Sequence, residues 1–292
     1  MPGLKDVKTK ISGIKKTAQI TKAMNMVASA KLRGAQLKME RFRPYAAQFN
    51  TAMANLSGSS DAGAAPLMEV REVKSVEIVV VTSDRGLCGS FNSNIFKQAE
   101  RLMREQEKQG RKVTFVCVGR KGFQYFRKTG KVRAHFTDIM SSFQMYNARE
   151  IAQDVTANFL GGGSDEVKLV YGGFRSVAVQ RPATKELLPI KPLSGAPAKA
   201  ASTGTAGAYT YEPEPAEILQ VLLPLYLNVM IFHSMLEVGA SEHAARMTAM
   251  DNATTACKDM IKQLTLLYNK ARQASITSEL MDIVGGAEAL KG

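Results

Sequence analysis

The sequence has 292 residues, 45% of them hydrophobic, which allows one large or two modest domains with a sizeable core. Its formal net charge of +13 predicts an anionic partner: nucleic acid, acidic lipid or an acidic protein surface. Three widely spaced cysteines, Cys88, Cys117 and Cys257, exclude a disulfide framework and favour a reducing compartment, and we expect no signal peptide because no apolar segment follows Met1.

Residues 1–57 are predicted to form one long helix. Apolar residues recur at alternating spacings of three and four from Leu4 to Leu56, and only Thr21 and Asn25 interrupt this stripe. Sustained spacing of this kind is the coiled-coil pattern. At about 1.5 Å per residue such a helix exceeds the width of an ordinary domain, so part of it is expected to project. We expect Pro44 to kink or break it.

Most of the positive charge lies on this helix. Residues 1–43 contain eight lysines and three arginines against Asp6 and Glu40. A charge run of this kind is commonly a solvated helix face. The alternative is a basic helix that meets an acidic partner.

After a linker at 58–74, the pattern changes to an α/β domain at 75–190. Runs rich in β-branched residues alternate with amphipathic segments, which predicts a Rossmann-like, mostly parallel sheet. The expected strands are 76–82, 113–118, 133–139 and 167–171, with a hairpin partner near 177–190. The expected helices are 90–109, 121–129 and 148–160.

Residues 191–210 are rich in Ala, Gly, Ser and Thr and are predicted to be a flexible loop, after which 215–292 is a second long helix. Apolar spacing of three and four runs from Met247 to Ala271. The stretch 218–236 is uncharged and long enough to cross a bilayer, but its polar residues and Pro224 favour a buried helix of a soluble protein. The two terminal helices therefore predict an antiparallel coiled coil around an inserted α/β domain, and a helical dimerisation arm is left open.

The sequence shows no catalytic constellation. It lacks a phosphate-binding loop motif, and the segment 83–90 offers only Gly86 and Gly89 where a dinucleotide-binding turn would lie. Within that segment, Asp84 is interpreted as a cap of the following helix and Gly86 as a tight turn. We therefore expect no catalytic residue and no cofactor.

The histidines also predict no metal site. His135, His233 and His243 have no ligand spacing to one another or to cysteine, and His233 is interpreted as a satisfied core residue. Nucleic-acid binding is weakly supported, because the basic helix matches no standard module and its charges lie opposite an apolar stripe that needs a protein partner.

Several ordered motifs resemble one family. The segment 276–289 (ITSELMDIVGGAEA) is similar to the terminal motif of gamma subunits of bacterial F-type ATP synthases. The same family is resembled, in order along the chain, by 20–28, 43–45, 83–89, 211–213, 241–247 and 268–275.

This resemblance implies a non-catalytic rotor shaft in a proton-translocating ATP synthase. The expected partners are three alpha and three beta subunits, the epsilon subunit and the ring of c subunits, and no nucleic acid. The expected location is peripheral, on the cytoplasmic face of the bacterial inner membrane. The implied shaft carries torque from the c ring to the beta subunits.

The resemblance also implies three groups of contact residues. Those expected to face the beta and alpha subunits are Lys22, Met24, Lys31, Arg33, Arg246, Arg272, Gln273, Thr277 and Glu279. Those expected to turn in an apolar bearing are Ile276, Leu280, Ile283, Ala287 and Leu290. Those expected at the foot, against the c ring and epsilon, are Tyr209, Tyr211, Glu212 and Glu214, within a segment 191–214 that faces the c ring.

The main alternative is an α/β nucleotide-binding enzyme with helical dimerisation arms. Nucleotide binding at the loop Asp84–Gly89 would distinguish it from a shaft. A basic DNA-binding coiled coil would instead show salt-sensitive binding that is lost on charge reversal at Lys22, Lys31 and Arg33.

Overall fold

The computed structural model describes residues 4–59, 65–191 and 215–289. The chain forms two compact units, one made of Met1–Ser29 with Arg246–Gly292 and one made of Ala30–Ala245. Two long helices, α1 (Leu4–Ser59) and α5 (Pro215–Ala289), contribute to both units. The expected foot residues Tyr209, Tyr211, Glu212 and Glu214, the predicted loop at 191–210 beyond residue 191, and Leu290 lie outside the described residues.

The larger unit contains a five-stranded sheet in the order β3-β2-β1-β4-β5. Its strands are β1 (Ser75–Val81), β2 (Lys112–Val118), β3 (Val132–Phe136), β4 (Glu166–Phe174) and β5 (Gln180–Leu188). The first four are parallel and β5 is antiparallel to β4. The predicted mostly parallel, Rossmann-like sheet between two long terminal helices is therefore confirmed.

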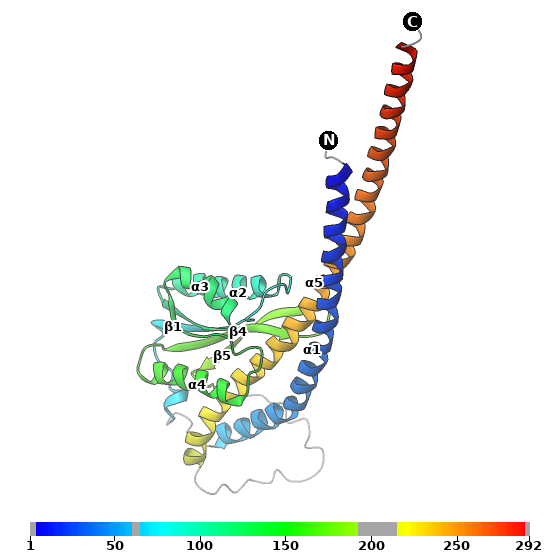
Figure 1. Ribbon diagram of the computed structural model, residues 1–292. Coiled ribbons are helices and arrows are strands. Elements are labelled where there is room, and N and C mark those ends of the chain that lie inside the picture. Colours follow the sequence, from blue (N-terminus) through cyan, green and yellow to red (C-terminus); the bar gives the residue numbers. More distant parts are fainter. Residues whose placement is uncertain (1–3, 60–64, 192–214, 290–292) are drawn as a thin grey trace. The chain divides into compact units, whose positions relative to one another are not determined.

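Helices cover both faces of this sheet (Figure 1). Helices α2 (Phe91–Lys108) and α3 (Arg120–Phe126), the latter followed by a 3-10 turn Arg127–Thr129, lie on one face, and α4 (Met145–Leu160) lies on the other. A 3-10 turn Pro66–Met68, absent from the sequence prediction, precedes β1. The expected strand at 133–139 is shorter, and the expected helix at 148–160 begins three residues earlier.

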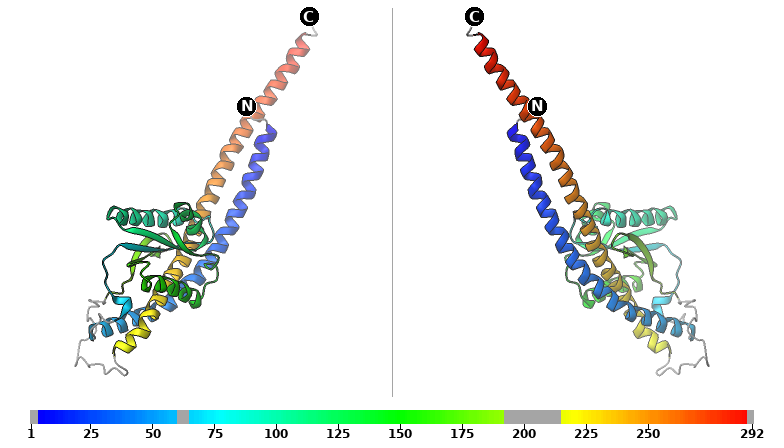
Figure 2. Two further views of the ribbon diagram at one scale, coloured as in Figure 1. Left: turned by 90° about the vertical axis from the view of Figure 1, so that its left-hand side faces the viewer. Right: turned by 90° about the vertical axis from the view of Figure 1, so that its right-hand side faces the viewer.

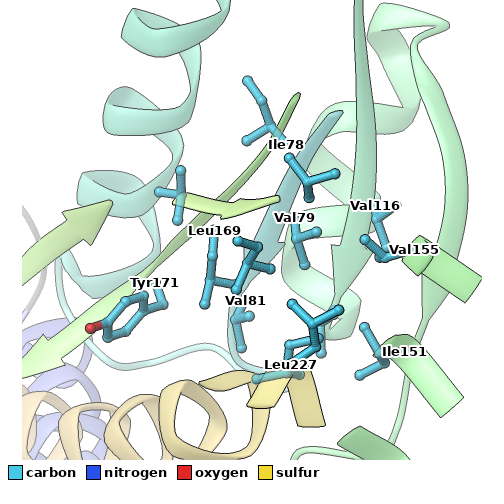
Figure 3. Packing of buried hydrophobic residues seen from close by; sticks show 14 of the residues in the cluster. Ile78, Val79, Val81, Val116, Ile151, Val155, Leu169, Tyr171 and Leu227 are labelled. Atoms are coloured by element: carbon cyan, nitrogen blue, oxygen red, sulfur yellow. The ribbon is translucent and has the colours of Figure 1, made fainter. Parts of the chain in front are cut away.

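The core of the larger unit is built from β-branched strand residues. Ile78, Val79, Val80 and Val81 of the central strand are fully buried. Figure 3 shows Val79 and Val81 close to Leu227 of α5, with Ile151 and Val155 of α4 nearby. Because both faces of the strand are covered, residues 78–81 form a continuous apolar run rather than an alternating pattern.

The uncharged stretch of α5 belongs to this core. Leu219, Leu223, Leu227 and Ile231 are at most 2% exposed. Within the described residues, α5 is the one helix long and apolar enough to span a membrane, and half of its most apolar window is buried in the protein. These burial values support the prediction of a core helix.

Of the two outcomes expected at Pro44, a kink or a break, the break does not occur, because helix α1 continues through this residue. Pro44 is exposed, and the helix bends in its second half (Figure 1). In this half Phe42 packs edge-on against Phe232 of α5, with the ring centroids 5.0 Å apart. A bent but continuous helix is one of the outcomes that proline permits.

Candidate subunit-contact surfaces

In the smaller unit, α1 and α5 run side by side (Figure 2). The predicted stripe of α1 is buried or half-buried at every described position from Leu4 to Met53, whereas most positions between them are exposed. On α5 the stripe from Met247 to Ala271 is likewise buried or half-buried. The periodicity therefore marks the faces that meet.

The two polar interruptions of the stripe find partners across the helix pair. The hydroxyl groups of Thr21 and Thr254 lie 2.7 Å apart and both side chains are buried. The Asn25 amide donates to the backbone carbonyl of Met247 over 2.9 Å. Polar groups bonded across an apolar seam favour one register of the two helices, because sliding breaks the cross-helix bonds.

Basic residues expected to meet the beta subunits lie away from the stripe. Lys22, Lys31 and Arg33 are exposed, and Met24 is half-buried. Among the described residues, no carboxylate forms an ion pair with these three cations. Their charge is therefore presented to solvent.

The residues of α5 that were expected to contact the alpha and beta subunits fall into two classes of exposure. Arg272, Gln273, Thr277 and Glu279 are exposed, although Glu279 accepts from Ser275 Oγ at 3.1 Å and Thr277 Oγ1 donates to the Gln273 carbonyl at 2.9 Å. Arg246 is different, because it is only 8% exposed within the chain itself. It has little surface left for a partner.

The expected bearing residues form an exposed apolar surface. Ile276, Leu280 and Ile283 are 55%, 59% and 71% exposed, and Ala287 is also exposed. Met281 and Val284 are exposed as well, at 64% and 49%, and the sequence stripe missed them. Every described residue from 276 to 289 is exposed, and Met281 and Val284 make the apolar surface wider than the predicted stripe.

The loop after β1 is held by Asp84. Its Oδ1 accepts from the backbone N–H groups of Arg120 and Asp138, at 2.8 and 3.0 Å, and its Oδ2 accepts from that of Met140 at 2.8 Å. Asp84 therefore does not cap α2 as expected; it caps the start of α3 and ties three loops together. These N–H groups are unavailable to a phosphate, and the Asp84 charge would repel one.

Backbone conformation in this loop also differs from expectation. Leu87 and Gly89 adopt positive φ angles of 62° and 57°, whereas the expected turn residue Gly86 does not. Leu87 is 64% exposed. A left-handed leucine at a loop tip is unusual, because its Cβ crowds the backbone.

His233 lies in a half-buried cluster of ionisable side chains in the larger unit. Its Nδ1 is 3.1 Å from Glu237 Oε1, which places the imidazole proton on Nδ1. Burial, followed by the charges of Lys185 and Arg43, lowers the pKa of His233 to about 4. Burial raises the pKa of Glu237 against the opposing effects of the Phe174 N–H, Lys185 and Arg43. At neutral pH His233 is therefore an uncharged hydrogen-bond donor.

Within the ranges that the structure describes, no three His, Cys, Asp or Glu side chains gather in a way that could hold a metal ion. One carboxylate, Glu77, is fully buried on the central strand. Arg133 Nε donates to its Oε1 over 2.5 Å and is itself paired with Asp154. Burial raises the pKa of Glu77, but its site is closed by side chains from β3 and α4.

Comparisons with known proteins agree over the whole chain. Residues 3–290 match the model of a family described as ATP synthase. The chain is similar to the ATP synthase gamma chain of Desulfotalea psychrophila, at 61% identity over all of both chains. It is also similar to that of Nitratidesulfovibrio vulgaris strain Miyazaki F, at 54% identity over all of both chains.

Solved structures show the same fold. A chain from the central stalk and c ring of the Tetrahymena thermophila mitochondrial ATP synthase is 25% identical, with a TM-score of 0.60 over 80% of this chain and 99% of that one. A chain from a Euglena gracilis mitochondrial ATP synthase structure, comprising OSCP, F1 and the c ring, is 20% identical. It has a TM-score of 0.69 over 98% of this chain and 94% of that one.

Proposed function

The chain belongs to the ATP synthase gamma chain family, and from this premise we propose that it is the non-catalytic central shaft of a rotary, proton-translocating ATP synthase. In this role it carries torque between a ring of c subunits and a catalytic head of three alpha and three beta subunits, with the epsilon subunit beside its foot. Catalysis belongs to the beta subunits.

The observation that carries this proposal is the incomplete burial of α5. Helix α1 covers one stripe of α5, yet Leu266, Leu280, Met281 and Ile283 are 59–72% exposed. Large exposed apolar patches on soluble proteins mark surfaces that a partner covers. Apolar contacts are non-directional, so they allow a shaft to turn in a close-fitting sleeve.

The exposed cations support an acidic partner around the shaft. We assign contacts with the beta and alpha subunits to Lys22, Met24, Lys31 and Arg33 of α1. On α5 the same role goes to Arg272, Gln273, Thr277 and Glu279. The buried Arg246 is assigned a smaller contact, made by the part of its side chain that stays accessible.

The remaining segments complete the proposed shaft. The bearing comprises Ile276, Leu280, Ile283, Ala287 and Leu290, and the exposure of Met281 and Val284 adds them to it. We assign 1–57 and 215–292 to the coiled coil, 58–74 to a linker and 75–190 to the α/β domain. The segment 191–214, with Tyr209, Tyr211, Glu212 and Glu214, is assigned to the foot on the c ring. With this foot on the c ring, the proposed location of the chain is the cytoplasmic face of a bacterial inner membrane.

The geometry disfavours a nucleotide-binding enzyme. Doubly wound sheets bind ligands beyond the carboxyl ends of their strands at the switch point, which here lies between β1 and β4. At this end of the sheet the Asp84 carboxylate, which repels phosphate, is bound by the N–H groups of Arg120, Asp138 and Met140 from the loops that follow β2 and β3. The end of β4 is bonded to α5 through Ser241 Oγ and the Gly172 carbonyl. Both features count against a phosphate site here.

Single-molecule rotation tests the proposal. The chain is assembled with its cognate alpha and beta subunits, and a probe is attached to the α/β domain at an exposed cysteine that replaces Lys128. We expect ATP-driven rotation of the probe in three-fold steps. If folded partners form no complex with the chain, or if the probe stays fixed during ATP hydrolysis, the shaft assignment is wrong.

A truncation tests the bearing separately. Removing the chain from Ile276 onward is expected to weaken coupling or assembly and to leave the folding of the α/β domain intact, because described residues beyond 276 are exposed. Full ATP synthesis by the truncated enzyme would contradict the bearing assignment. It would leave the shaft assignment standing, since the remaining coiled coil can still carry torque.

A further inference from the structure

The end of β4 extends beyond its neighbour in the sheet. Pairing of β1 with β4 stops at Val170, whereas pairing of β4 with β5 continues to Phe174. Opposite Gly172 on β5 stands Pro182, which has no N–H to donate. Along this stretch the described sheet has a strand on one side of β4 only, so its backbone polar groups need partners from elsewhere.

Helix α5 supplies those partners with two side chains. Glu237 Oε2 accepts from the Phe174 N–H at 3.1 Å, and Ser241 Oγ donates to the Gly172 carbonyl at 3.1 Å. Glu237 and Ser241 are four residues apart and so lie on one face in successive turns. The result is a two-point attachment of α5 to β4.

Small residues on β4 permit the close approach. A Cβ on Gly173 would lie 3.4 Å from Glu237 Oε2 and 3.2 Å from the Arg181 carbonyl. A Cβ on Gly172 would lie 2.3 Å from the Phe91 ring of α2. A side chain at Gly172 would clash with Phe91, and one at Gly173 would require its neighbours to shift slightly, so α2 and α5 both approach this strand end closely.

The attachment is buried and electrostatically supported. Ser241 is fully buried, and the Glu237 side chain is 15% exposed. Groups from every adjoining element face the carboxylate: Arg43 of α1, Lys185 of β5 and His233 of α5. The Lys185 ammonium also lies over the Tyr171 ring of β4, 5.4 Å from its centroid. A charged acceptor in such a place makes a stronger hydrogen bond than a neutral one.

We propose that Glu237 and Ser241 are positioning residues that form a torque-bearing clasp between the α/β domain and α5. Apolar packing between a helix and a sheet is non-directional and resists sliding weakly, whereas two buried hydrogen bonds to the backbone hold one register. This inference rests on the proposed shaft function. Turning force applied to the α/β domain passes through the clasp into α5.

The decisive variants separate the hydrogen bonds from packing. Glu237→Leu removes the acceptor at similar size, and Glu237→Gln keeps an oxygen that can accept from Phe174. Ser241→Ala removes the second bond. Its matched control is Ser234→Ala, because Ser234 is equally buried on α5 but donates to Ile231 of its own helix. Glu186→Gln controls for the loss of a negative charge, because Glu186 is an exposed residue of β5 that pairs with Lys191.

Two measurements are made on each variant. Backbone hydrogen exchange of segment 172–174 is followed in the full chain, alone and assembled. We expect Glu237→Leu to raise the exchange rate about tenfold, the equivalent of one lost bond to a charged group, and Ser241→Ala to raise it less. Protons pumped per ATP hydrolysed are then measured in vesicles that hold the assembled enzyme.

The coupling ratio decides the role. We expect it to fall for Glu237→Leu, to fall furthest for the double variant, and to recover in Glu237→Gln, while both controls match the wild type. Faster exchange with a wild-type coupling ratio would show a purely structural contact and overturn the proposal, as would unchanged exchange. A wild-type chain that gives no coupled enzyme with its cognate partners would instead overturn the proposed function, and the exchange result would stand independently.

Discussion

The two compact units of the chain bury their apolar residues in different ways. In the larger unit, Ile78, Phe115 and Leu169 have no exposed surface, and helices cover both faces of the sheet. In the smaller unit, two helices bury one stripe each, and large apolar side chains such as Leu266 remain exposed. The larger unit has an enclosed core of its own, whereas the smaller unit leaves exposed an apolar surface of the kind that partners cover.

The largest expected effect comes from the interior of the sheet. Phe115→Ala removes a ring that stacks on Phe126 with the centroids 4.4 Å apart. Because the site is fully buried, we expect a loss of about 3–5 kcal/mol in the free energy of unfolding of the larger unit. Urea unfolding followed by the near-UV circular dichroism of tyrosine measures this loss. Seven of the eight tyrosines, all but Tyr268, fall within the residue range of the larger unit. An effect below 1 kcal/mol would show that the unit is not closely packed.

A pH experiment tests whether the His233 side chain is shielded from solvent in the larger unit. The pKa of His233 is about 4 in the folded chain, against 6.5 for the ordinary side chain. Between these values the unfolded chain binds a proton that the folded chain does not. The contribution of His233 to the free energy of unfolding is therefore fully present above pH 6.5. It is lost as the pH falls towards 4, by up to about 3 kcal/mol.

His233→Gln provides the comparison, because it removes this titration and leaves the other groups in place. We expect the wild type to lose more stability than the variant between pH 7 and pH 4, measured as the difference in urea midpoints. Glu237 and Glu77, whose pKa values are raised by burial, change in the opposite direction and are present in both chains. Parallel pH profiles of the two proteins would mean that His233 is solvated.

The third prediction concerns the polar seam of the smaller unit. Replacing either Thr21 or Thr254 with valine leaves the other hydroxyl buried without its cross-helix partner, so each single change is expected to cost about 1 kcal/mol. The double replacement is expected to cost less than the sum, because both polar groups are gone. Hydrogen exchange of residues 4–29 in the four proteins of this cycle gives the coupling energy, and strict additivity would show that the two hydroxyl groups do not interact.

The sequence predicted the parts of this structure that depend on periodicity. The spacing of three and four in α1 identified its buried face correctly, including the polar positions Thr21 and Asn25 as its interruptions. Runs rich in β-branched and other apolar residues identified the parallel strands β1, β2 and β4. Each of these signals is local in sequence, and burial on one or both faces translates directly into the pattern of residues.

The features that the sequence could not show depend on contacts between distant segments. Asp84 was assigned to the nearest helix, yet its partners Arg120, Asp138 and Met140 come from two later loops. The start of α4 was missed because Gln144 is not a usual capping residue, although its N–H donates to Asn147 Oδ1 at 2.9 Å. The bonds of Glu237 and Ser241 to β4 were missed because nothing in the sequence of α5 indicates partners that lie 63 and 69 residues earlier in the chain.

The smallest expected effect on the isolated chain gives the sharpest form of the comparison between the units. Ile283 is 71% exposed, so Ile283→Ala removes little buried surface and is expected to change the stability of the isolated chain by less than about 0.5 kcal/mol. If a partner covers this surface, the same change removes buried apolar area in the assembled enzyme. The ratio of the two effects therefore measures how much of the α5 surface is built for a partner. The effect in the assembled enzyme is measured as the affinity of the chain for cognate alpha and beta subunits. This affinity is compared for the wild type, Ile283→Ala and the exposed, charge-neutral control Ser278→Ala. Equal affinities for all three would place Ile283 outside any interface.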